Sequence, residues 1–180
     1  MSDQPSPTPE KVLFSGQRFR IHQVSSELPD GTRIEKQIIR HPGAVVILPL
    51  LDPDHVLMIR NYRYSVARTL LELPAGTREP DETPAETATR ELNEETGYIA
   101  GNLQFIQSFY AAPGCGDEQM FLFVATDLQR SSPNRETGEQ IENEVLPWTE
   151  VEAQLDQGAI QDAKSLIGLL YGLRRRQQAR

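Results

Sequence analysis

The chain has 180 residues, 38% of them hydrophobic, and a formal net charge of −8. This length predicts one domain, and no apolar run approaches the roughly 20 residues that cross a bilayer. The acidic charge disfavours nucleic acid and anionic membranes as partners, because both bind largely by charge. Cys115 is the single cysteine, so no intrachain disulfide can form and a reducing, cytoplasmic compartment is expected.

The first part of the chain is predicted to be a polar tail followed by two strands. Residues 1–10 are polar and proline-rich, and they lack the basic and apolar regions of a signal peptide. Residues 12–40 alternate between apolar and polar types, interrupted once by the turn sequence LPDG at residues 28–31. The pattern predicts an antiparallel pair of strands near residues 18–26 and 32–40.

Further strands follow, separated by turns rich in glycine, proline and polar residues. The run AVVILPLL at residues 44–51 is apolar throughout, as expected for a strand buried on both faces. The other strands are expected at residues 56–62, 70–73, 103–112, 119–126 and 141–146.

The helix expected after Thr83 has a clear beginning and end. Thr83, Pro84 and Glu86 are the residue types of an N-cap, a first helical position and the third position of a capping box. Gly97 is the type that ends a helix in the left-handed conformation. The sequence therefore predicts a helix from Pro84 to the residue before Gly97.

Two more helices are expected near the C-terminus. One should begin at Thr149, with Glu152 completing a second capping box, and the other should span residues 162–177. The resulting order of strands, helix, strands and helices contains no repeat and no β-α-β series. It favours an α+β fold, a sandwich around a mixed sheet.

Glutamates crowd the end of the first helix. Glu91, Glu94 and Glu95 are spaced i, i+3 and i+4, so their carboxylates lie close together and repel one another. Taken alone, this spacing is more typical of a solvated acidic face than of a site. A divalent cation would remove the repulsion, and ligands that are all oxygen indicate Mg²⁺ or Mn²⁺.

Residues 76–98 carry a resemblance to a known family, and they read GTREPDETPAETATRELNEETGY. This stretch resembles the signature of the Nudix hydrolases, with one loose position at Tyr98, where the family usually has an aliphatic residue. The signature's fixed positions are matched by Gly76, Glu82, Arg90-Glu91-Leu92, Glu94-Glu95 and Gly97. Four shorter segments resemble those of ADP-ribose pyrophosphatases: HPGAV at 41–45, NYR at 61–63, ELPAG at 72–76 and Pro113-Gly114.

The resemblance implies an α/β/α Nudix sandwich over residues 42–180 and an N-terminal β segment over residues 11–41 through which a homodimer forms. It implies Mg²⁺-dependent attack of water on the diphosphate of a nucleoside diphosphate-sugar. ADP-ribose or a related ADP-sugar is the expected substrate, and AMP and a sugar phosphate are the expected products.

The implied metal ligands are the carboxylates of Glu91, Glu94 and Glu95 and the carbonyl of Ala75. Arg90 is expected to orient the glutamates by ion pairing. Glu82 is expected to be either an outer ligand or a charge that favours the helix dipole, and the sequence does not decide between these roles.

The expected substrate contacts begin with Arg63, whose planar guanidinium suits phosphate oxygens. An exposed position at a strand end is the alternative for Arg63, and a structural hydrogen bond is the alternative for Glu72. The full expected substrate-binding set is Arg63, Arg60, Glu72, Gly114, Asp117 and Arg40.

A general base is expected in the loop that follows the Pro-Gly strand. The resemblance makes Glu139 the first candidate and Glu142 the second, although acids in loops are usually only solvated. Glu95 and Arg90 complete the expected catalytic set. Cys115 has no histidine partner nearby in sequence and is not expected to act as a nucleophile.

Other functions stay open from the sequence. The same chemistry could act on GDP-mannose or a diadenosine polyphosphate. The chain could also be a nucleotide-sensing Nudix module without activity, although such modules tend to lose the acids that this chain retains. An acidic scaffold protein is the remaining alternative, and only the net charge favours it.

Overall fold

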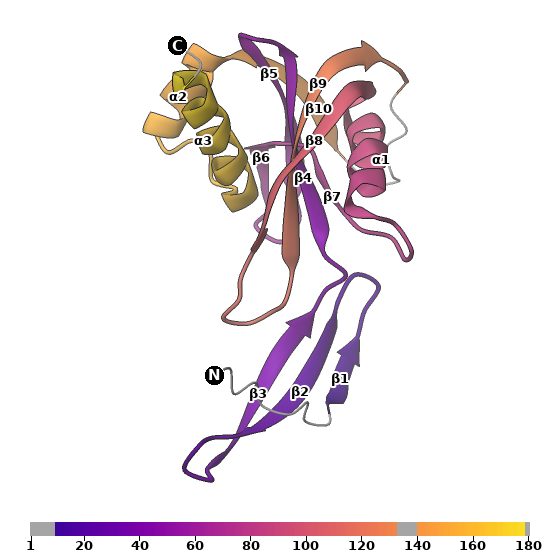
Figure 1. Cartoon of the computed structure of the whole chain (residues 1–180), viewed down its shortest axis with the longest axis vertical. Helices are drawn as coiled ribbons and strands as arrows, with labels where there is room; N and C mark the ends of the chain where they lie inside the picture. Colours follow the sequence, from indigo (N-terminus) through magenta and orange to yellow (C-terminus); the bar gives the residue numbers. More distant parts are fainter. Residues whose placement is uncertain (1–9, 133–139, 179–180) are drawn as a thin grey trace.

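The computed structural model describes residues 10–132 and 140–178. It shows a small antiparallel sheet beside a larger body of one sheet flanked by helices (Figure 1). The chain is thus the predicted α+β sandwich around a mixed sheet, preceded by an N-terminal β segment. Within the described residues, the helices fall short of the length and apolarity that crossing a bilayer requires.

The N-terminal sheet has the order β1-β2-β3. Its strands are β1 (Lys11–Ser15), β2 (Arg20–Glu27) and β3 (Arg33–Arg40). The predicted pair corresponds to β2 and β3, whose turn contains Gly31 at a positive φ of 84°. The sequence did not predict β1, a strand whose five residues are all exposed.

The main sheet has seven strands and the order β10-β5-β4-β9-β8. The short strand β6 pairs with β5, and β7 pairs with β4. Only the pairing of β4 with β9 is parallel among the described strands, which makes the sheet mixed. The strands are β4 (Ala44–Asp52), β5 (His55–Arg63), β6 (Arg68–Glu72), β7 (Ala75–Thr77), β8 (Tyr98–Tyr110), β9 (Gln119–Arg130) and β10 (Ile141–Pro147).

Helices cover both faces of this sheet, with α1 on one side and α2 and α3 on the other (Figure 1). The helices are α1 (Pro84–Thr96), α2 (Trp148–Asp156) and α3 (Ala163–Gln178). Alternate residues of β4 serve the two faces: Val45 and Ile47 pack with Leu92 of α1, and Val46 and Leu48 pack with Leu169 of α3. Burial on both faces explains why β4 is a continuous apolar run.

The helix ends follow the sequence rules in α1 and depart from them in α2. In α1, the Glu86 N–H donates to Thr83 Oγ1 and the Thr83 N–H donates to Glu86 Oε2, so the capping box is confirmed. The predicted capping box at Thr149 is wrong. The N-cap of α2 is Pro147, because β10 runs to that residue and the buried Trp148 begins the helix directly.

Two other differences concern strand ends. The strand expected at residues 70–73 corresponds to β6, and a strand that the sequence did not predict follows it: Ala75–Thr77 form β7 and pair with β4. The strand expected at 103–112 begins earlier, at Tyr98, immediately after α1. Gly101 and Asn102 in this early part are poor strand formers, and pairing with β9 overrides that preference.

Candidate active site

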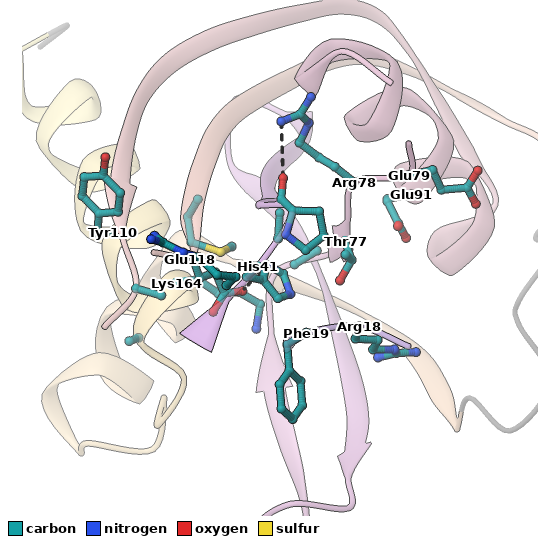
Figure 2. Close-up of a pocket in the computed structure, with 18 of the residues that line it drawn as sticks. Arg18, Phe19, His41, Thr77, Arg78, Glu79, Glu91, Tyr110, Glu118 and Lys164 are labelled. Carbon is teal, nitrogen blue, oxygen red and sulfur yellow. Dashed lines mark hydrogen bonds and ion pairs between the residues drawn. The ribbon is translucent and has the colours of Figure 1, made fainter. Parts of the chain in front are cut away.

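A cavity of about 1030 Å³ lies where the N-terminal sheet meets the α/β/α body (Figure 2). Its size suits a nucleotide-sized ligand, because small-molecule sites span roughly 300–1,000 Å³. Five stretches far apart in sequence contribute to its lining: residues 16–20, 40–44, 75–80, 109–111 and 162–167. Of the helices, α1 and α3 contribute residues from opposite faces of the sheet.

The acidic wall of the cavity comes from α1. Glu91 and Glu95 are one helical turn apart, and both line the cavity. Glu91 is only 9% exposed and Glu95 only 3% exposed. The N–H of Ala75 donates to Glu95 Oε2 at 2.9 Å, which fixes this carboxylate against the end of the β6–β7 link. Burial of two neighbouring carboxylates is costly unless cations or hydrogen-bond donors face them.

Arg90 is the principal cation of this wall. Its Nε and Nη2 donate to the two carboxylate oxygens of Glu82 at 2.8 and 3.0 Å. Its Nη1 donates to Glu91 Oε1 and to Glu94 Oε2, both at 2.9 Å, and Nη2 also reaches the Thr77 carbonyl at 3.2 Å. The hydrogen bonds with Glu82 and the charges of its other partners raise the pKa of Arg90. The orienting role of Arg90 stays a prediction, and these contacts support it.

Glu82 should make the folding stability of the protein vary with pH in the acidic range. Its hydrogen bond with Arg90, supported by the Glu79 N–H and the Thr87 hydroxyl, lowers the pKa of Glu82 from 4.5 to about 2. A lowered folded-state pKa stabilises the fold above the unfolded pKa, and this stabilisation is lost as pH falls toward the folded value.

We therefore expect Glu82→Gln to lower the melting temperature at neutral pH, with a loss on the order of 1 kcal/mol after solvent screening. The gap between the variant and the wild-type chain should narrow from about pH 5 to about pH 2. Thermal unfolding measured across this range checks the prediction. A gap that stays constant with pH would contradict it.

The backbone of β7 lies directly against the Glu91 carboxylate. A Cβ atom added at Gly76 would stand 1.9 Å from Glu91 Cδ, so only glycine leaves room for the carboxylate here. Within the described part of the chain, no three histidine, cysteine or acidic side chains converge on one point. Mg²⁺ does not need such a cage, because it usually binds one or two carboxylates and completes its shell with water and substrate phosphates. The oxygen donors of Glu91 and Glu95, which line the cavity, fit that pattern, whereas Glu94 is not among the described residues that line it.

A second charged cluster borders the cavity, centred on Glu72 at the end of β6. This carboxylate is fully buried and accepts hydrogen bonds from Arg63 Nε at 2.7 Å and Nη2 at 2.5 Å. Lys164 Nζ, from the first turn of α3, reaches the same carboxylate at 2.6 Å. Arg63 and Lys164 both line the cavity, and Lys164 and Glu91 lie on opposite sides of the view in Figure 2. The sequence analysis missed Lys164.

Arg40 and Asp117 connect the N-terminal sheet to the loop between β8 and β9. Arg40 Nη1 donates to Asp117 Oδ2, and the His41 N–H donates to Asp117 Oδ1, both at 2.9 Å. Arg40 lines the cavity and also binds Glu10. Gly114 lies in the same loop, with open space where a Cβ would be.

Six of the described expected site residues are not among those that line the cavity: Glu72, Glu94, Gly114, Asp117, Arg60 and Glu142. Arg60 is exposed and donates from Nη2 to Glu144 Oε1 at 3.0 Å, across the β5–β10 pairing. Glu142 faces Arg60 in the same register and is exposed. Neither is among the described residues that line the cavity. Glu139 lies outside the described residues.

The N-terminal sheet contributes residues that the sequence analysis did not assign to the site. The turn between β1 and β2 brings Arg18, Phe19 and Arg20 to the cavity, and Figure 2 shows Arg18 and Phe19 at its edge. The sequence signal that could have identified this turn is an aromatic residue flanked by two arginines. Two arginines so close together are notable in a chain with a net charge of −8.

Comparisons with known proteins point the same way as this geometry. The NUDIX domain model matches residues 40–167. The chain is 37% identical to a Bacillus subtilis ADP-ribose pyrophosphatase, over 90% of this chain and 89% of that protein. It is 32% identical to a Bacillus methanolicus methanol dehydrogenase activator, over 88% and 87% of the two chains. A crystal structure of an ADP compounds hydrolase aligns with a TM-score of 0.83 at 25% identity and covers 98% of this chain and 96% of its own.

The matched region contains the buried glutamates of α1, the cluster around Glu72 and all but the first residues of the cavity lining. The sequence signature, the mixed sheet and the matched family model agree over the same residues. The chain therefore belongs to the Nudix hydrolase family.

Proposed function

We propose that this enzyme hydrolyses the diphosphate bond of ADP-ribose or a related ADP-sugar, giving AMP and a sugar phosphate. The observation that carries the proposal is that buried carboxylates and a guanidinium line one cavity. Glu91 and Glu95 of α1 supply the carboxylates, and Arg63 supplies the guanidinium. The likeness to an ADP-ribose pyrophosphatase over nine-tenths of the chain supports the choice of substrate.

Mg²⁺ or Mn²⁺ is the proposed cofactor. When bound, such a cation neutralises the charge of the diphosphate and lowers the pKa of the attacking water. Glu91 and Glu95 would hold it, with Glu94 and the Ala75 carbonyl as further candidates. Arg90 would keep the glutamates in place through the hydrogen bonds described above.

Other residues of this chain would bind the substrate and accept the proton. Arg63 would bind phosphate oxygens, since a guanidinium presents several donors in a fixed plane. Arg40, Asp117 and Gly114 would bind the parts of the substrate nearer the N-terminal sheet. Substrate contact by Arg60 and Glu72 stays a prediction.

The proposed general base is Glu139 or Glu142. Either Glu139 or Glu142 would have to come within about 3 Å of the attacking water to take its proton. Glu142 lies on β10, the strand that begins just after the undescribed segment containing Glu139.

We also propose that the chain forms a homodimer through its N-terminal sheet. Val12, Leu13 and Phe14 of β1 are 43% to 52% exposed, which is an apolar edge that a second copy could cover. Sedimentation equilibrium of the whole chain should give twice the monomer mass, and a monomer mass at micromolar concentration would reject the proposal.

A substrate panel tests the proposed reaction. We expect kcat/KM for ADP-ribose to exceed that for GDP-mannose and for a diadenosine polyphosphate by at least about tenfold, with AMP released. Chelation of divalent cations should abolish turnover. Faster turnover of GDP-mannose would overturn the substrate assignment. Absence of turnover with every compound would favour the nucleotide-sensing alternative.

A further inference from the structure

We propose that Lys164 is a positioning residue that holds the buried carboxylate of Glu72 and, through it, the guanidinium of Arg63. The inference rests on the proposed function, in which Arg63 binds the diphosphate of the substrate. It adds a residue from α3 to the anion-binding side of the cavity. This residue lies outside the signature and outside the four shorter segments that resemble ADP-ribose pyrophosphatases.

The geometry places Glu72 between two cations. Arg63 Nε and Nη2 donate to the two carboxylate oxygens of Glu72. Lys164 Nζ, from α3, donates to Oε2 of the same carboxylate. The Glu72 side chain is 1% exposed, whereas those of Arg63 and Lys164 are 33% and 16% exposed and line the cavity. A bidentate pair fixes the orientation of the guanidinium plane. The position of Glu72 therefore sets where the remaining donors of Arg63 can reach an anion.

The location of Lys164 in α3 is unfavourable for the helix itself. The first turn of a helix carries the positive end of its dipole, where a lysine is destabilising and an acid is favourable. Asp162 supplies the favourable contacts, accepting from the Ser165 N–H at 3.0 Å and pairing with Lys164 at 2.9 Å. Lys164 opposes the helix dipole and binds the buried carboxylate of Glu72, which indicates that its role lies outside the helix.

The charges of the cluster give Lys164 a defined effect. Arg63 and Lys164 are the cations that bind Glu72. The hydrogen bonds with Glu72 and the charges of Glu72, Glu95 and Asp162 raise the pKa of Arg63. Without Lys164, Arg63 alone would balance the buried Glu72 carboxylate, and that carboxylate could move together with Arg63.

The fold does not depend on Lys164 for the attachment of α3. Ser165 Oγ accepts the N–H of Leu73 at 2.7 Å, and Leu169 of α3 is fully buried in the core. These contacts tie the helix to the link after β6 without Lys164. Lys164→Met, which keeps the length of the apolar stem, should therefore fold.

The test is a double-mutant cycle on the binding of inorganic diphosphate in the presence of Mg²⁺, measured by calorimetry. The proteins are the wild-type chain, Lys164→Met, Arg63→Ala and the double variant. We expect Lys164→Met to weaken binding roughly tenfold, the lower end of what losing an outer partner of a binding group costs. In the Arg63→Ala background, Lys164→Met should lower the affinity for diphosphate by less than about twofold, because the effects of residues that act as one unit are not additive.

Two further variants separate positioning from a structural effect. Lys164→Arg should restore most of the affinity, since it keeps a cation on Glu72. Lys36→Met removes an exposed lysine of β3 and should bind as the wild-type chain does. Melting temperatures measured on all variants show whether each has folded.

Additive losses from Lys164→Met and Arg63→Ala would overturn the inference, as would unchanged affinity in Lys164→Met or no binding by the wild-type chain. Hydrolysis of ADP-ribose by the wild-type chain is measured separately. If it is absent while the cycle shows coupling, the proposed reaction fails and the positioning role stands. If it is present while the losses are additive, the positioning role fails and the reaction stands.

Discussion

Glu95→Gln should lower kcat for ADP-ribose by about 10²- to 10³-fold, a loss typical of removing one preorganised electrostatic group. The amide can still accept the Ala75 N–H that now reaches Glu95 Oε2 at 2.9 Å, so the local structure should persist. What the amide lacks is the negative charge that would hold a divalent cation beside the diphosphate. Steady-state kinetics at several Mg²⁺ concentrations, with thermal unfolding of the same preparations, measure both effects.

Glu86→Gln is the matched control, because it makes the same substitution on the same helix. Glu86 belongs to the capping box, where glutamine serves as well as glutamate, and it does not line the large cavity. Its kcat should equal that of the wild-type chain. Equal turnover in Glu95→Gln and Glu86→Gln would reject Glu95 as a metal ligand.

The acidic wall could be predicted from sequence because it is local. Glu91 and Glu95 belong to one helix, so the helical repeat alone places them together, and the capping box at Thr83 fixes where that repeat begins. The strand β4 was predictable for a related reason, since burial on both faces leaves no polar position to interrupt its apolar run.

The cluster around Glu72 could not be predicted in this way because its contacts are long-range. Lys164 and Glu72 are separated by 92 positions, and nothing in the local pattern of either residue indicates that α3 begins beside the end of β6. Glu72 showed the same limit: its sequence context allowed a structural hydrogen bond or a substrate contact. The structure shows a fully buried carboxylate between two cations.

The short strands were missed where pairing, not residue preference, creates the structure. β7 has only three residues, and its pairing with β4 places Gly76 against the Glu91 side chain. The glycine that begins the signature therefore has a steric reason to be there. The same contact makes Gly76 the position where the smallest substitution should have a large effect on activity.

Gly76→Ala should lower kcat/KM at least about 100-fold, the loss expected when a catalytic group is misplaced by about 1 Å. The new Cβ would lie 1.9 Å from Glu91 Cδ and Oε1, so the carboxylate must leave its place. The melting temperature should change little, because the displaced atoms are the far end of a flexible side chain and Gly76 does not have a positive φ.

The double variant Gly76→Ala, Glu91→Ala separates this steric effect from a general loss of structure. With the Glu91 carboxylate removed, the alanine at position 76 no longer meets it, so adding Gly76→Ala to Glu91→Ala should change neither the residual activity nor the melting temperature. Two losses that add would mean that Gly76 acts through the backbone of β7 and not through Glu91. Near-normal activity in Gly76→Ala alone would show that the reaction does not need the Glu91 carboxylate where β7 now holds it.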